Sequence, residues 1–112
     1  MKTDNTDFKH LYQALIDRIL KGEGYSTQQD RLAAFANENV QPPLDLLVDK
    51  VAHQAFKISD KDIDMARQSG VSEDQLFELI VCAAVGQASR QYQSGLSALA
   101  DATKKEGGPY AS

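Results

Sequence analysis

The segment from Leu76 to Val85 constrains the fold of this 112-residue chain more than any other segment does. Its one charged side chain is Glu78, and its other side chains are apolar apart from the weakly polar Cys82. Just upstream, Ser72 and Gln75 have the spacing of a capping box, which marks the start of a helix. A helix that is apolar on all sides must be buried. The pattern therefore predicts a helix that starts at Ser72 and is buried, either in its own core or against a partner.

The same helix is expected to continue to about Ala102. The apolar positions thin to one stripe at nearly four-residue spacing, formed by Ala88, Tyr92, Leu96 and Leu99. About 31 helical residues would span about 46 Å, whereas a compact domain of this size has a radius of gyration of about 13 Å. We therefore expect either a kink near Gly86 or Gly95, or a far end that projects onto another subunit.

Four shorter helices are predicted upstream, because apolar residues recur there at three- and four-residue steps. The first covers Phe8 to Leu20 and stops before Gly22; the second is capped by Ser26 or Thr27 and has Leu32, Phe35 and Ala36 inward; the third begins at Leu44; and the fourth, Asp60 to Ser69, is capped by Ser59 and stopped by Gly70. The prediction is one all-α domain over residues 1–112, a bundle of about five helices. Residues 104–112 are expected to form a flexible tail.

The composition excludes several classes of protein. The net charge of −4 and the pI near 5.0 argue against a nucleic-acid partner, since nucleic-acid-binding domains usually have a basic face. The sequence lacks an apolar run of about 18 residues, so no membrane span is predicted, and the polar N-terminus is unlike a secretory signal. A single cysteine cannot form an internal disulfide, which favours the cytoplasm.

The second half of the chain, from Val51 to Leu99, resembles the AhpD-like superfamily, which includes carboxymuconolactone decarboxylases, alkylhydroperoxidase partners and peroxidase-related proteins. The resemblance rests on Ser59-x-x-Asp62-Ile63, Ala66-x-x-x-Gly70-Val71-Ser72-Glu73-Asp74, Phe77-Glu78-Leu79 and Ala83-Ala84-Val85-Gly86, followed by Arg90 and Leu96. It implies an all-helical fold that assembles through its helices into dimers, trimers or hexamers.

The chain departs from the redox-active members of that superfamily, which carry a Cys-x-x-Cys pair and a nearby His. Counting back from Ala66 without gaps, one common family spacing places these three positions at Ala55, Ile58 and Asp62. A dithiol site needs one thiolate to attack and a second thiol to resolve the intermediate. Without either thiol, no catalytic residue carries over from the family.

Two residues of the long helix are candidates for another site. Cys82 is either an inert buried thiol or a reactive one, and Glu78, one turn earlier on the same face, could act as its base. A nearby carboxylate also raises the pKa of a thiol, which opposes thiolate formation. Glu78 itself either emerges at the surface, where it can pair with Lys or Arg, or forms a buried polar site.

The remaining candidates are weaker. His53 lies beside the apolar stripe of the third helix and is interpreted as a surface or boundary residue, with a catalytic role as the alternative. His10 is expected to be solvated. Arg90 is interpreted as part of a structural ion pair, with an anion-binding role as the alternative. The spacing of the two histidines argues against a zinc site, and no metal or cofactor is predicted.

Two classes of function follow from these observations. The favoured one is a catalytically silent AhpD-like subunit, a homo-oligomer that binds a small ligand or serves in assembly, with Leu76–Val85 and the stripe of the first helix at the contact. The alternative is an enzyme, either a carboxymuconolactone decarboxylase-like lyase or a one-thiol peroxidase, that uses Glu78, Cys82, His53 or Arg90.

Overall fold

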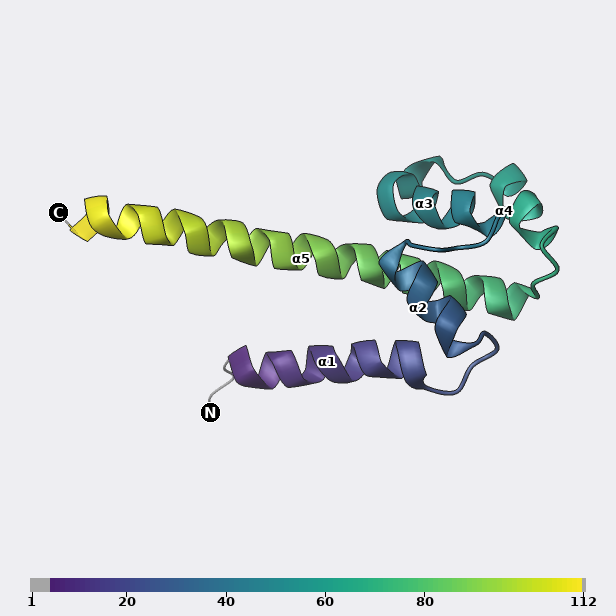
Figure 1. Ribbon diagram of the computed structural model, residues 1–112, viewed down its shortest axis with the longest axis horizontal. Coiled ribbons are helices and arrows are strands. Elements are labelled where there is room, and N and C mark those ends of the chain that lie inside the picture. Colours follow the sequence, from purple (N-terminus) through teal and green to yellow (C-terminus); the bar gives the residue numbers. More distant parts are fainter. Residues whose placement is uncertain (1–4, 112) are drawn as a thin grey trace.

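The computed structural model describes the backbone of residues 5–111 and the side chains of residues 9–104. That part of the chain is all-helical, with five α-helices and one 3-10 turn (Figure 1). The elements are α1 (Asn5–Lys21), α2 (Gln28–Ala36), α3 (Leu44–Gln54), η1 (Ala55–Lys57), α4 (Asp60–Arg67) and α5 (Glu73–Ala111). The predicted fold class, about five helices with a long C-terminal one, is confirmed.

Helix α5 is the central element of the fold, and the other helices pack against it. Helices α2, α3 and α4 gather around its N-terminal half, and α1 runs antiparallel beside its middle (Figure 1). The ring of Tyr12 on α1 lies 5.8 Å from the ring of Tyr92 on α5, and the hydroxyls of Tyr12 and Ser89 are hydrogen-bonded. The C-terminal part of α5 extends past the other helices, so the molecule measures 61 × 30 × 22 Å.

The hydrophobic core lies between the N-terminal half of α5 and helices α2 to α4. Its buried members are Ala34, Leu47, Val48, Val51, Ala66, Leu76, Leu79, Cys82 and Ala83. The apolar run of α5 is therefore buried on one face, in the core of its own chain. On the opposite face Phe77 remains 68% exposed, so this run presents less surface to a partner than its sequence predicts.

The predicted helix caps at Ser72 and Ser59 and the predicted helix stop at Gly70 are confirmed. The Ser72 hydroxyl accepts from the Gln75 amide at 3.1 Å, and the Gln75 side-chain oxygen accepts from the Ser72 amide at 2.9 Å. Ser59 and Asp62 form a second capping box at the start of α4. Gly70 has a φ of 94°, the left-handed conformation that its predicted role as a helix stop requires.

The predicted end of the long helix is wrong. α5 continues to Ala111 as one helix, where an end near Ala102 was expected, and it has no kink at Gly86 or Gly95. Most residues from Ala98 to Glu106 are strong helix formers, and no proline of α5 comes before position 109. The far end of α5 projects past the other helices of its own chain, and its contact with another subunit stays a prediction.

Helix α2 crosses α5 at Gly86, where the two backbones touch. A Cβ atom added to Gly86 would lie 1.9 Å from the carbonyl oxygen of Phe35. One turn further along α5, Nη1 of Arg90 donates to the same oxygen at 2.6 Å, and Nε and Nη2 donate to Gln87. Arg90 thus satisfies a carbonyl at the C-terminal end of α2, a structural role, although the expected ion pair is replaced by neutral acceptors.

A candidate ligand cavity beside Cys82 and Glu78

The loop between α1 and α2 is anchored to α5 by Glu78. The backbone amide of Tyr25 donates to Oε2 of Glu78 at 2.6 Å, and the amide of Ser26 donates to Oε1 at 2.8 Å. Gln75, one turn earlier, donates to the Tyr25 carbonyl at 3.0 Å. A Cβ atom added to Gly24 would lie 2.7 Å from Oε2, so glycine there lets the loop approach the carboxylate closely. Glu78 is therefore half-buried, and each of its carboxylate oxygens accepts a hydrogen bond from a backbone amide.

The surroundings of Glu78 favour its charged form. Burial raises the pKa of this carboxyl, but the amides of Tyr25 and Ser26 and the positive charge of Arg31 outweigh that effect, so the pKa is lower than its ordinary value of 4.5. A carboxyl with a lowered pKa is ionised at neutral pH. It is therefore suited to hold the loop, and poorly suited to take up a proton as a general base.

Replacing Glu78 with glutamine is expected to lower the free energy of unfolding by about 1 to 3 kcal/mol near neutral pH, because hydrogen bonds to a charged acceptor are the stronger ones. A lowered pKa in the folded state adds stability above the unfolded pKa, and this stability is lost as the pH falls through the folded pKa. The difference between the wild type and Glu78→Gln should therefore be constant well above 4.5 and shrink below it.

Urea unfolding over a range of pH values measures this difference. Glu38→Gln, at an exposed position after α2, is the matched control and should change the free energy of unfolding little at any pH. A difference for Glu78→Gln that does not change with pH would contradict the role of the charge.

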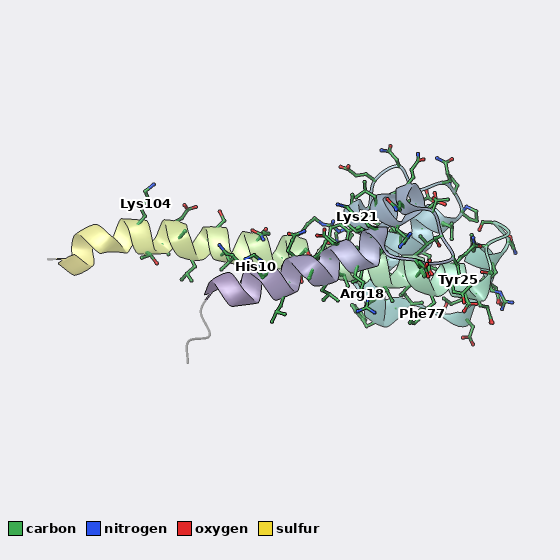
Figure 2. All side chains as sticks on the ribbon, turned by 90° about the horizontal axis from the view of Figure 1, so that it is seen from below. His10, Arg18, Lys21, Tyr25, Phe77 and Lys104 are labelled. Atoms are coloured by element: carbon green, nitrogen blue, oxygen red, sulfur yellow. The ribbon has the colours of Figure 1, made fainter. Side chains whose placement is uncertain are left out.

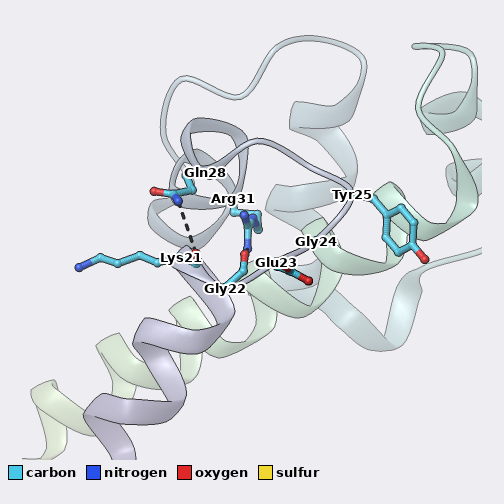
Figure 3. Close-up of a pocket in the computed structure, with 7 residues that line it drawn as sticks. All are labelled: Lys21, Gly22, Glu23, Gly24, Tyr25, Gln28 and Arg31. Carbon is cyan, nitrogen blue, oxygen red and sulfur yellow. Dashed lines mark hydrogen bonds between the residues drawn. The ribbon is translucent and has the colours of Figure 1, made fainter.

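Arg31 of α2 is the site residue that sequence analysis missed. Its side chain points back to the end of α1, and the whole residue is only 5% exposed (Figure 3). Nη1 donates to the carbonyl oxygens of Ile19 at 3.1 Å and Gly22 at 2.7 Å, so Arg31 caps the C-terminus of α1. Nε is buried without a hydrogen-bond partner among the described residues.

A signal for Arg31 was present in the sequence. Arg31 precedes Phe35 by four residues, so the two share a helix face, and Phe35 was predicted to point inward. Leu32, which was predicted to point inward as well, is 55% exposed. The prediction for Leu32 is wrong because the inward face of α2 carries Arg31 and Ala34 instead.

Two cavities share Arg31 as a lining residue. The first, which we call the thiol cavity, has a volume of about 400 Å³ and lies between α1, α2 and α5; its walls are Leu15, Arg18, Ile19, Glu23, Arg31, Phe77, Glu78, Val81 and Cys82. The second is more open, has a volume of about 670 Å³ and follows the α1–α2 loop; it is lined by Lys21, Gly22, Glu23, Gly24, Tyr25, Gln28 and Arg31 (Figure 3). The thiol cavity is the more apolar of the two and contains both Glu78 and Cys82.

Cys82 lies at the inner wall of the thiol cavity and is 1% exposed. Burial raises the pKa of its thiol to about 11; the charge of Arg31 lowers the pKa and the charge of Glu78 raises it, and burial dominates. A thiol with this pKa is protonated at neutral pH and is a poor nucleophile. The geometry therefore favours the interpretation of Cys82 as an inert buried thiol.

The other candidates lie away from this cavity. His53 is an exposed residue of α3, with Nε2 3.7 Å from Oδ1 of Asp49, and it does not line the thiol cavity. His10 is exposed on α1. Within the described residues, no three His, Cys, Asp or Glu side chains are grouped as metal ligands. The structure thus brings Glu78 and Cys82 together, and leaves His53 and Arg90 elsewhere.

The three positions at which the resemblance places a redox motif have structural roles here. Ala55 begins η1, and Ile58 packs against the core. Asp62 accepts from Nζ of Lys50 at 2.8 Å and from the Ser59 amide at 2.9 Å, and these hydrogen bonds lower the pKa of its carboxyl.

Comparisons of the chain with protein-family models, with curated proteins and with solved structures give no match. Over the residues that the structure describes, no helix is both long and apolar enough to cross a membrane.

Proposed function

We propose that this chain is a catalytically silent subunit of an AhpD-like homo-oligomer, which holds a small ligand in the thiol cavity. The observation that carries the proposal is a set of exposed apolar side chains on the antiparallel helices α1 and α5. These side chains, which we call the apolar stripe, are Leu11 and Leu15 on α1, and Phe77, Tyr92, Leu96 and Leu99 on α5. Soluble monomers rarely expose so many large apolar side chains on neighbouring helices.

The projecting part of α5 strengthens the case for a partner. Every residue from Gln91 to Lys104 is exposed, and a Cβ atom added to Gly95 would meet nothing within 4 Å. Helical segments of this length are marginal in water without packing. A second copy that packs its own α1 and α5 against this pair would form a four-helix arrangement and cover the stripe.

The proposed contact differs from the one that the sequence predicted. Leu76, Leu79, Cys82 and Ala83 of the run Leu76–Val85 are buried in the core of their own chain. The contact is therefore proposed on the stripe of α1 and on the distal half of α5, with Phe77 at its edge.

The protonated state of Cys82 and the occupation of Glu78 by loop amides favour a silent subunit over the enzyme alternatives, a decarboxylase-like lyase or a one-thiol peroxidase. A single free thiol is consistent with a reducing compartment, so we place the protein in the cytoplasm.

Charged substitutions in the stripe test the assembly. Leu99→Glu is expected to weaken self-association by at least about 100-fold, because an unpaired carboxylate would be buried at the contact. Leu46→Glu on α3 is the matched control, since Leu46 and Leu99 are both 63% exposed. Light scattering over a dilution series measures both variants. A wild-type mass retained by Leu99→Glu and by Leu11→Glu would contradict the proposed contact.

A further inference from the structure

We propose that the ligand of the thiol cavity is a small carboxylic acid with an apolar body. The inference deepens the proposed function and rests on its claim that the cavity binds a small molecule. Its starting point is Arg31, whose side chain is buried and whose Nη1 donates to two carbonyl oxygens. Nε is buried and has no hydrogen-bond partner among the described residues. A buried guanidinium that is not fully hydrogen-bonded favours a negatively charged ligand group nearby, which compensates its charge.

A second guanidinium faces the same cavity. Arg18 of α1 is exposed at the rim, and within residues 9–104 its side chain has no hydrogen bond or ion pair. Figure 2 shows Arg18 and Phe77 on the same side of the molecule, and both line the cavity. Arginine binds carboxylates with paired hydrogen bonds, and a free arginine at the rim can do so without first breaking another interaction.

The acidic groups of the cavity limit the charge that it can accept. Glu78 directs its two oxygens toward the amides of Tyr25 and Ser26, and Glu23 is exposed at the rim. Two arginines, Arg18 and Arg31, and two carboxylates, Glu23 and Glu78, therefore line the cavity. One carboxylate on the ligand can pair with Arg18 at the rim and lie near the positive charge of Arg31. A dianion such as phosphate would meet both acidic side chains and an apolar wall, so a monocarboxylate is the better match.

The apolar wall of the cavity determines the size and the apolar character of the rest of the ligand. Leu15 and Ile19 of α1 face Phe77 and Val81 of α5 across the cavity. The volume of about 400 Å³ is near the lower end for small-molecule sites, so it suits a single ring or a short alkyl chain. Leu15 and Phe77 also lie at the edge of the proposed contact, so a second copy would close the cavity over the ligand.

Calorimetric titration of the full chain with benzoate, and separately with benzamide, tests the inference. The two probes share a ring and differ in the charge of the polar group. We expect benzoate to bind at least about tenfold more tightly than benzamide, and Arg18→Gln to weaken benzoate binding by at least about tenfold, because charge-assisted hydrogen bonds are lost. Arg67→Gln on α4 removes the same charge far from the cavity and should leave benzoate affinity unchanged.

Each result bears on the inference. No benzoate binding, equal affinity for the two probes, or an Arg18→Gln variant with wild-type affinity would overturn it. The mass of the protein, measured in the same samples, tests the assembly separately. An oligomer that binds only benzamide would reject the carboxylate and retain the proposed function, whereas a monomer that binds benzoate would do the reverse.

Discussion

Replacing Gly86 with alanine is expected to destabilise the protein more than any other small substitution in α5, by about 3 kcal/mol. Alanine stabilises a helix by about 1 kcal/mol relative to glycine, so helix propensity alone predicts that Gly86→Ala would stabilise the protein. The added Cβ would, however, lie 1.9 Å from the Phe35 carbonyl oxygen and 2.9 Å from its Cα. Because these are backbone atoms, relief requires α2 to move away from α5, which also disturbs the hydrogen bond between Arg90 and Phe35.

Gly95→Ala is the matched control in the same helix. Its Cβ meets nothing within 4 Å among the described residues, so we expect it to raise the free energy of unfolding by about 0.5 to 1 kcal/mol. Thermal or urea unfolding compares the two variants directly. A Gly86→Ala protein as stable as Gly95→Ala would show that α2 does not cross α5 at this residue.

The parts of the fold that could be predicted are those that neighbours in the sequence decide. Ser59 with Asp62, and Ser72 with Gln75, form their capping boxes within one turn of helix, so residue types and spacing sufficed. The end of α5 could not be predicted in the same way. Glycine and proline at positions 107 to 109 suggested a stop, but α5 continues to Ala111, and the strong helix formers from Ala98 to Glu106 explain its extension beyond Ala102.

The candidate site was predictable only in part. Glu78 and Cys82 share a cavity because residues four apart lie on one helix face, which the sequence shows. The amides that hold Glu78 come from the loop after α1, about 50 residues earlier in the chain, and no local pattern connects the two. Arg31 enters the site through the crossing of α2 over α5, a tertiary arrangement that helical periodicity does not specify.

Cys82 is expected to react with a thiol reagent at least about 100-fold more slowly in the native protein than after denaturation. The native pKa of about 11, against 9.0 for an exposed thiol, lowers the fraction of thiolate by about 100-fold, and burial slows access further. Labelling with a chromogenic disulfide, with and without denaturant, measures the two rates.

Labelling of Cys82, together with an assay of hydroperoxide turnover, distinguishes the silent subunit from a one-thiol peroxidase. Cys82→Ala is expected to leave hydroperoxide turnover at the level of a protein-free control, as the wild type should. Fast labelling of the native thiol, together with peroxidase activity that Cys82→Ala abolishes, would favour the enzyme. Cys82→Ser is a useful second variant because it keeps the branching and length of the side chain approximately while it removes the thiol.

The proposed function requires a second copy that covers the apolar stripe of α1 and the distal half of α5. The most direct test is the mass of the unmodified protein in solution, measured by light scattering at micromolar concentration. The account predicts a stable species of at least twice the 12.3 kDa of one chain. A species of 12.3 kDa that persists as the concentration is raised would contradict it.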